Sequence, residues 1–196
     1  SSTEASTYSV LSGEFNLYPR ESNGWDENGW SIIIPSEDSR LIYVSSSSGN
    51  DETAEFYAPR DVASVEDPGS IKPFKTIEAA NSNARDGFPD WILLLKGDAW
   101  EVHENIQLKI GRSVTERSVI TSYGLGGQRP MIKSDANETF RIWSYRRYVA
   151  ITGLAFYAYK RDPASSEFSG WGQVAESTAI RMYSPKGSVM GTVLLE

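Results

Sequence analysis

Eight short apolar runs follow Gly97, and no convincing helical pattern lies between them. They cover residues 106–108, 119–121, 131–133, 140–143, 149–151, 155–157, 180–182 and 193–195. Gly, Asn, Asp, Ser and Pro separate the runs, which is typical of short strands joined by turns. So many short strands predict either a β-sandwich or a solenoid, and a repeat would favour the solenoid.

Two different spacings pair these runs. In one, apolar residues recur every 24 residues, at Leu108, Ile132, Phe156 and Ile180. In the other, residues 140–142 match 180–182 and residues 148–152 match 192–196, which leaves 162–177 as one long loop. We favour the second spacing because it matches pairs of runs in order. Either spacing indicates stacked parallel strands with inward apolar and outward polar side chains.

Residues 41–98 contain a helical pattern. A β-branched and aromatic strand is expected at 41–44, followed by a long polar connection. From Pro73, apolar residues recur at helical steps at Phe74, Ile77, Ala80 and Ala84. Residues 91–95 show no polar alternation, which predicts a strand buried on both faces, as in a parallel sheet.

Three stretches of this region together resemble the N-terminal part of right-handed parallel β-helix proteins of the pectate-lyase-like superfamily. They are YVSSSSGND at 43–51, PFKTIEAA at 73–80 and PDWILLLKGD at 89–98. RSVITSYG at 117–124, RPMI at 129–132 and YVAITGLAF at 148–156 look like the first rungs of such a coil. The resemblance covers about residues 39–196.

This resemblance implies an all-β fold, a right-handed parallel β-helix (solenoid) with an N-terminal capping α-helix. We therefore expect an extension or linker over 1–38, the capping strand, loop, helix and first rung over 39–98, and further rungs over 99–196. The chain ends in an expected strand without a second cap. We expect it to be the N-terminal portion of a longer protein, or to form a homo-oligomer or filament through that end.

The superfamily includes polysaccharide lyases, glycoside hydrolases, epimerases, phage tailspikes and adhesins, so the resemblance is more specific for fold than for function. It implies an extracellular or cell-surface protein that acts on or attaches to polysaccharide. We favour the N-terminal part of a polysaccharide lyase over a glycoside hydrolase. The alternative is a non-catalytic structural or adhesive β-helix, such as a tailspike or a surface filament subunit.

Catalytic residues are not identified by the sequence. A hydrolase needs two carboxylates in one outward column of neighbouring strands. The acids considered all fall in expected turns or loops, namely Asp98, Glu101, Glu104, Glu116, Asp135, Glu138, Asp162 and Glu167. His103 is the only histidine, and without an evident partner it is interpreted as a surface turn residue.

Basic and aromatic residues are densest between positions 141 and 181. Because aromatic rings pack on sugar rings and arginines pair with carboxylates or sulfates, this region predicts a site for an acidic polysaccharide. The predicted substrate-binding residues are Arg141, Trp143, Tyr145, Arg147, Tyr157 and Arg181. The alternative is that solvent-facing strand positions simply favour such residues.

Charge and composition narrow the choice of partners. The net charge of −7 argues against wrapping a nucleic acid, which needs a basic face. No apolar stretch approaches the length of a membrane span. The chain has no cysteine, which removes disulfides and thiolate metal sites. Asn50 and Asp51 supply clustered oxygen ligands, so calcium is a candidate cofactor there, the alternative being an ordinary solvated loop.

Overall fold

The computed structural model describes residues 26, 29–143, 145–168, 170–171, 178–183 and 193–196. The chain divides into two units, Ser1–Ile34 and Pro35–Glu196. In the first unit, the backbone N–H of Trp30 donates to Oδ1 of Asp26 at 2.9 Å and closes a tight turn. Every strand and helix assigned within the described residues belongs to the second unit.

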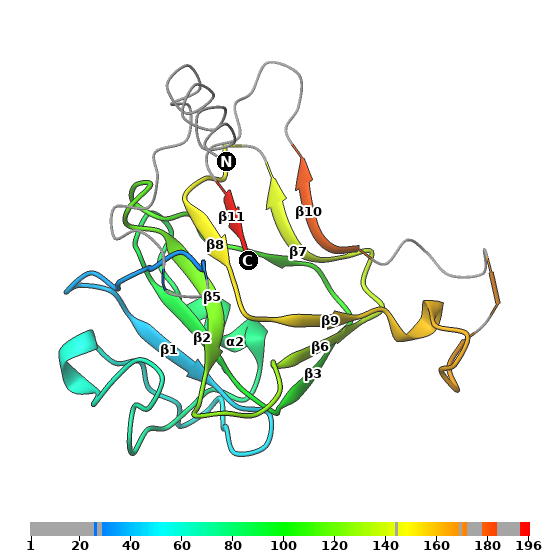
Figure 1. Cartoon of the computed structure of the whole chain (residues 1–196), viewed down its shortest axis with the longest axis horizontal. Helices are drawn as coiled ribbons and strands as arrows, with labels where there is room; N and C mark the ends of the chain where they lie inside the picture. The colour runs from blue at the N-terminus through cyan, green and yellow to red at the C-terminus, as the bar shows by residue number, and fades with distance from the viewer. Residues whose placement is uncertain (1–25, 27–28, 144, 169, 172–177, 184–192) are drawn as a thin grey trace, which may run out of the picture. The chain divides into compact units, whose positions relative to one another are not determined.

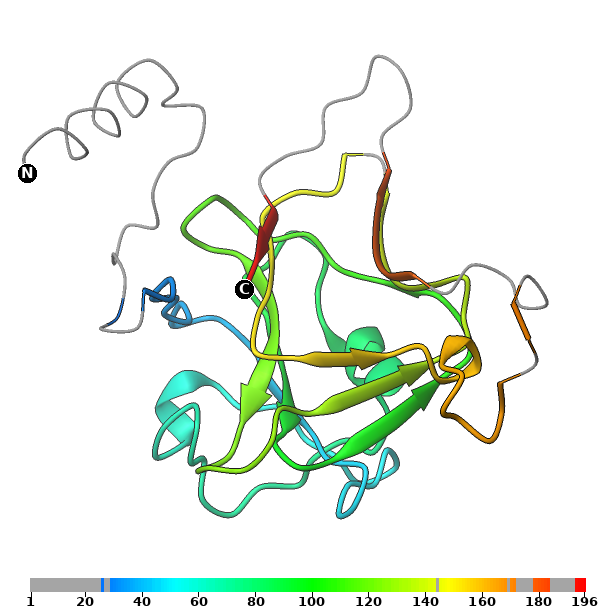
Figure 2. The same ribbon diagram turned by 45° about the vertical axis from the view of Figure 1, so that its right-hand side comes forward.

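Three parallel sheets make up the second unit (Figure 1, Figure 2). The first sheet contains, in spatial order, β1 (Leu41–Val44), β2 (Trp91–Leu95), β5 (Ser118–Tyr123), β8 (Val149–Ile151) and β11 (Val193–Leu195). The second contains β3 (Ala99–Val102), β6 (Met131–Ser134) and β9 (Ala155–Tyr157). The third contains β4 (Ile106–Gln107), β7 (Glu138–Trp143) and β10 (Thr178–Tyr183). The fold is mostly β, and these sheets differ from the antiparallel sheets of a β-sandwich.

Successive strands visit the three sheets in a repeating order, β2–β3–β4, then β5–β6–β7, then β8–β9–β10. The favoured spacing is confirmed, because Ile180 lies opposite Phe140 and Val193 lies opposite Val149. Of the 24-residue series, only the pair Ile132 and Phe156 is formed. The rest of that series is wrong because the loops between strands differ in length, so the repeat is not constant along the chain.

Inward side chains from all three sheets form one hydrophobic core. The expectation that residues 91–95 are buried on both faces is confirmed for most of β2, where Leu93 and Leu94 are both fully buried. Leu94 belongs to the common core. On the opposite face of the sheet, Tyr43 packs edge-on against Tyr57 and Tyr123 and donates from its hydroxyl to the Val65 carbonyl. The long connection after β1 therefore covers the outer face of the first strands.

The helix α2 spans Ile77–Asn83 and begins later than the sequence predicts. Pro73 lies outside it, because the next residue, Phe74, donates its backbone N–H to the Tyr43 carbonyl. Thr76 is the N-cap, and its hydroxyl accepts the N–H of Ala79 at 3.2 Å. Ile77 is fully buried and packs with the apolar residues of β1 and β2.

Two acidic residues expected in turns lie in strands instead. Glu101 is in β3, a strand the sequence did not predict because its four residues contain only two large apolar side chains, Trp100 and Val102. Glu138 begins β7. β3 is fixed by parallel pairing with β6, and β7 is fixed by parallel pairing with β4 and β10. Local sequence propensity does not predict such pairings.

The short 3₁₀ helices η1 (Pro59–Asp61) and η2 (Tyr159–Arg161) lie in connections. Within the described part of the chain, no helix is long and apolar enough to cross a membrane.

Candidate functional site

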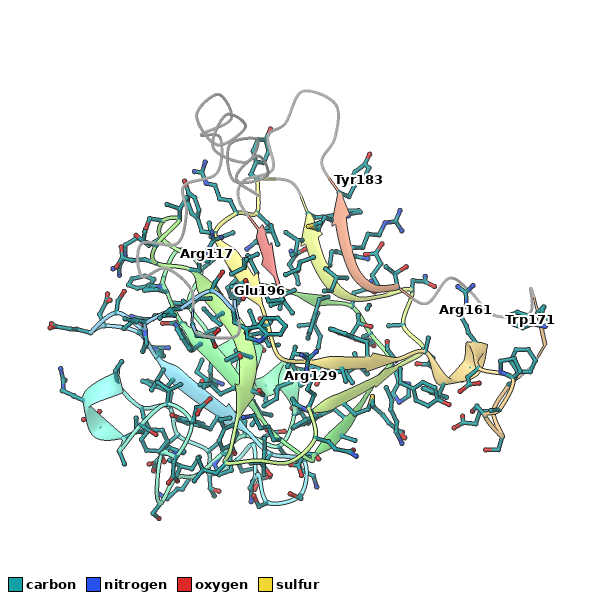
Figure 3. All side chains as sticks on the ribbon, viewed as in Figure 1. Arg117, Arg129, Arg161, Trp171, Tyr183 and Glu196 are labelled. Carbon is teal, nitrogen blue, oxygen red and sulfur yellow. The ribbon has the colours of Figure 1, made fainter. Side chains whose placement is uncertain are left out.

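Two neighbouring strands present a matched pair of arginines and a matched pair of aromatic rings. Arg181 of β10 lies opposite Arg141 of β7, and Tyr183 lies opposite Trp143. We call these four residues the arginine–aromatic face. They point outward because the alternate residues Phe140 and Ile142 of β7 are fully buried in the core. In Figure 3 the Tyr183 side chain stands at the end of β10 and points away from the sheet.

The two rings of the face lie close together and remain accessible. The centroids of Trp143 and Tyr183 are 5.6 Å apart, and the rings are tilted by 47°. Trp143 is 41% exposed and Tyr183 is 46% exposed. The guanidinium carbon of Arg141 lies 4.8 Å from the centroid of the Trp143 ring, within cation–π range.

A buried carboxylate holds both arginines in place. The Glu138 side chain is only 5% exposed. Its Oε2 accepts from Nε of Arg141 at 2.5 Å, and its Oε1 pairs with Nη1 of Arg181 at 2.8 Å. One carboxylate therefore fixes two positive side chains, each of which has further N–H donors for a ligand. The face carries a net positive charge on a chain whose total charge is −7.

The structure brings together three of the predicted binding residues, Arg141, Trp143 and Arg181. Tyr145 is exposed in the turn after β7, at a φ of 61°. Arg147 lies 5.4 Å over the ring of the neighbouring Tyr148. Tyr157 belongs to β9 in a different sheet. Its hydroxyl donates to Asp162 at 2.8 Å, and this bond raises the pKa of Tyr157.

Two contributors to the face were missed by sequence reasoning. Glu138 was expected in a turn, and Tyr183 lies one residue beyond the predicted run 180–182. Tyr183 follows from the spacing that matches 140–142 with 180–182, since extending it by one residue pairs Tyr183 with Trp143. The burial of Glu138 has no such signal in the sequence.

A second polar cluster forms where β3 and β6 end. His103 was interpreted as a residue without a partner, and this is wrong because its Nδ1 lies 2.6 Å from Oδ1 of Asp135. Nζ of Lys160, from η2, donates to the other oxygen of Asp135 at 2.6 Å. Burial alone would raise the pKa of Asp135, but the hydrogen bonds from Lys160 and His103 outweigh it and lower the pKa to about 2.

The predicted calcium ligands are engaged in local hydrogen bonds. Oδ1 of Asp51 accepts the backbone N–H groups of Lys75 and Thr76, and Oδ2 accepts the Thr76 hydroxyl at 2.9 Å. Oδ1 of Asn50 accepts the N–H of Glu52. Among the described residues, no group of three His, Cys, Asp or Glu side chains gathers where it could hold a metal ion. Calcium binding by Asn50 and Asp51 stays a prediction.

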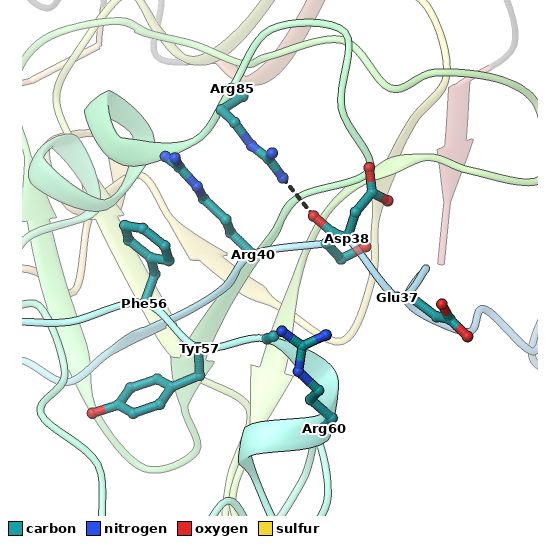
Figure 4. Close-up of a pocket in the computed structure, with 9 residues that line it drawn as sticks. Glu37, Asp38, Arg40, Phe56, Tyr57, Arg60 and Arg85 are labelled. Carbon is teal, nitrogen blue, oxygen red and sulfur yellow. Dashed lines mark hydrogen bonds between the residues drawn. The ribbon is translucent and has the colours of Figure 1, made fainter.

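An open pocket of about 490 Å³ lies beside β1 (Figure 4). It is lined by Glu37, Asp38, Ser39, Arg40, Phe56, Tyr57, Ala58, Arg60 and Arg85. Arg85 binds the fully buried carboxylate of Asp90 at 2.6 Å and the backbone oxygen of Asp38. Arg40 covers the Phe56 ring at 4.1 Å. Arg40 and Arg85 already make contacts within the fold. We therefore interpret this pocket as a structural feature and not as a ligand-binding site.

No protein-family model, curated protein or solved structure matches this chain. The candidate site is therefore defined by the chain's own residues and their geometry.

Proposed function

We propose that this chain is a right-handed parallel β-helix protein of the pectate-lyase-like kind that binds acidic polysaccharide on the arginine–aromatic face. The repeating order of strands through three parallel sheets supports the coil. The packing of α2 against β1 and β2, the first strands of their sheet, supports its role as a cap. Such a protein acts outside the cell or at its surface, where its ligand is found.

The observation that most supports an acidic polysaccharide as the ligand is the carboxylate of Glu138, which two arginines share. It orients two arginines beside two exposed rings, an arrangement that suits a sugar with a negatively charged substituent. The C–H faces of a sugar ring pack on Trp143 and Tyr183, while a carboxylate or sulfate accepts from Arg141 and Arg181. A merely solvated strand face does not require a buried acid beneath its arginines.

Oligosaccharide binding tests this proposal. Acidic oligosaccharides, such as oligouronates and sulfated chains, are titrated into the protein by calorimetry, with neutral oligosaccharides of equal length as reference. Because a charge-assisted hydrogen bond contributes roughly 1.5–3 kcal/mol, Arg181→Met should weaken binding about 10- to 100-fold. The matched control is Arg60→Met, which removes an exposed arginine outside the face. Equal affinity of both variants would refute the site, and no binding of any acidic chain would refute the function.

Within this function we favour a polysaccharide lyase over a glycoside hydrolase. The arginines suit a uronate chain, the class of substrate whose carboxylate a lyase neutralises before a base removes the adjacent proton. Glu138 does not supply a hydrolase pair, because it is buried and bound to two arginines.

A structural role in a homo-oligomer or filament is the second candidate, and the exposed edge of β10 favours it. Met182 lies opposite the fully buried Ile142 and so faces inward, yet it is 44% exposed. Leu195 of the edge strand β11 is also exposed. A second copy that covers this end would bury both side chains. Sedimentation at rising protein concentration tests it, since Met182→Lys should weaken self-association, and a wild-type monomer throughout would exclude this candidate.

A further inference from the structure

The ionised state of Asp135 fixes which nitrogen of His103 carries a proton. With its pKa near 2, Asp135 is a carboxylate at neutral pH and can only accept hydrogen bonds. The 2.6 Å contact therefore requires a proton on Nδ1 of His103. In the neutral imidazole the lone pair then lies on Nε2.

The Nε2 atom of His103 is accessible to a ligand. The His103 side chain is 59% exposed. Among the described residues, Nε2 has no hydrogen-bond partner, while Nδ1 is fixed by Asp135. Asp135 is itself fixed by Lys160, so the carboxylate cannot turn away from the ring without losing an ion pair. The imidazole is thus a base with a set tautomer and a set orientation.

A cation lies on the same outward track as this base. Lys133 of β6 is in register between Glu101 of β3 and Tyr157 of β9. It precedes Asp135, which follows directly after the strand, by two residues; both are partly exposed while Ser134 between them is buried, so they lie on the same side of the chain. Lys133 makes no ion pair within the part of the chain that the structure describes, so its ammonium group is available to a carboxylate.

The cluster lies close along the chain to Glu138, the carboxylate that holds the two arginines of the arginine–aromatic face. Only three residue steps separate Asp135 from Glu138 along the chain, so their Cα atoms lie at most roughly 11 Å apart. The cluster lies on one side of the turn between β6 and β7, and Glu138 begins β7 on the other. A polysaccharide held by the arginines can extend over the turn to His103.

We propose that His103 is the catalytic base of a β-elimination that cleaves a uronate-containing polysaccharide, with Lys133 binding the carboxylate of the reacting uronate. This inference rests on the proposed function. Nε2 takes the proton from the carbon that bears the carboxylate. The electron pair of that C–H bond forms a carbon–carbon double bond as the glycosidic C–O bond at the next carbon breaks. The departing oxygen keeps the electrons of its bond and takes a proton from water, and the imidazolium later returns its proton to solvent.

Asp135 and Lys160 are positioning residues in this reaction. Asp135 selects the tautomer of His103 and stabilises the imidazolium that forms, because it presents a negative charge to Nδ1. Lys160 keeps Asp135 ionised and in place. Removing Asp135 should therefore lower kcat without changing KM, whereas removing Lys133 should raise KM and lower kcat.

The experiment incubates the full chain with polygalacturonate and alginate and follows the ultraviolet absorbance of unsaturated uronates, while calorimetry measures binding of the same polymers. His103→Gln should lower turnover at least about 100-fold, with affinity unchanged within about twofold. Asp135→Asn should lower kcat and shift the 15N signals of His103 away from the Nδ1-protonated tautomer, and Asp135→Glu should restore part of the activity. Asp162→Asn is the matched control, because it removes a carboxylate that binds Tyr157 in the same region.

The possible results separate failure of the catalytic role of His103 from failure of the proposed binding function. Full turnover by His103→Gln, or an Nδ1 signal that Asp135→Asn does not change, would overturn the inference. Binding of uronate polymers by the wild type without any unsaturated product would also overturn it, but would leave the proposed binding function intact. Absence of both binding and product would overturn the inference and the proposed function together.

Discussion

Replacing Glu138 by Gln tests the centre of the candidate site, because it removes one charge and keeps the side-chain shape. The amide oxygen can still accept from one arginine, but the amide nitrogen then faces the other guanidinium, donor against donor. Losing both bonds of a buried acid would cost roughly 3–5 kcal/mol. Arg181 is 48% exposed, so its ion pair with Glu138 is half solvated and should contribute only roughly 0–1 kcal/mol to stability. Because the amide oxygen keeps one bond to an arginine, the loss should lie below the full range, and we expect Glu138→Gln to lower the free energy of unfolding by about 2–3 kcal/mol.

Urea unfolding followed by circular dichroism measures this change. With an m-value of roughly 2 kcal/mol per molar, the midpoint should fall by about 1–1.5 M. Arg60→Met is the control and should shift stability by less than about 0.5 kcal/mol, because Arg60 is exposed and its contact with Asp61 is long, at 3.8 Å. A Glu138→Gln midpoint within that control range would refute the claim that this acid anchors the face. The double variant with Glu138→Gln and Arg181→Met should lose less free energy of unfolding than the sum of the two single variants, because both substitutions remove the same ion pair.

Three further predictions concern the fold. Phe140→Ala should cost about 3–5 kcal/mol in urea unfolding, because Phe140 is fully buried, and Phe140→Leu should cost clearly less. Gly49→Ala should cost about 3 kcal/mol or more, because its Cβ would lie 2.1 and 2.4 Å from two backbone oxygens. Gly87→Ala should cost only about 1 kcal/mol, because nothing lies within 4 Å and only its positive φ opposes the change; equal losses would contradict this reasoning. The carboxyl of Asp135, whose pKa is lowered from 3.8 to about 2, should contribute about 2 kcal/mol of stability. That contribution should be complete above pH 4 and lost as the pH falls toward 2, so acid titration of Asp135→Asn should lack this loss.

Local patterns predicted most of the described strands and the helix α2. The apolar runs at 149–151, 155–157 and 193–195 coincide with β8, β9 and β11. Such runs are reliable because a strand in a buried sheet needs apolar side chains wherever it lies. The strand β3 was missed because only Trp100 and Val102 face the core, and its pairing with β6 comes from a distant segment.

The binding face was predicted in part. Arg141, Trp143 and Arg181 were identified from the density of basic and aromatic residues, and the favoured spacing already aligned the two arginines. The role of Glu138 was not predicted, because burial of an acid depends on the strands around it. The partners of His103 were not predicted either, because Asp135 and Lys160 come from segments 32 and 57 positions further along the sequence.

The sequence by itself determined most of the strands and which of their side chains face the core, because alternation and apolar composition are local properties. It also placed Arg141 and Arg181 on neighbouring strands through the match of 140–142 with 180–182. Only the tertiary structure decided which polar groups meet, since loops of unequal length set the register of each strand on the next. That register places Glu138 under two arginines, and Asp135 between His103 and Lys160.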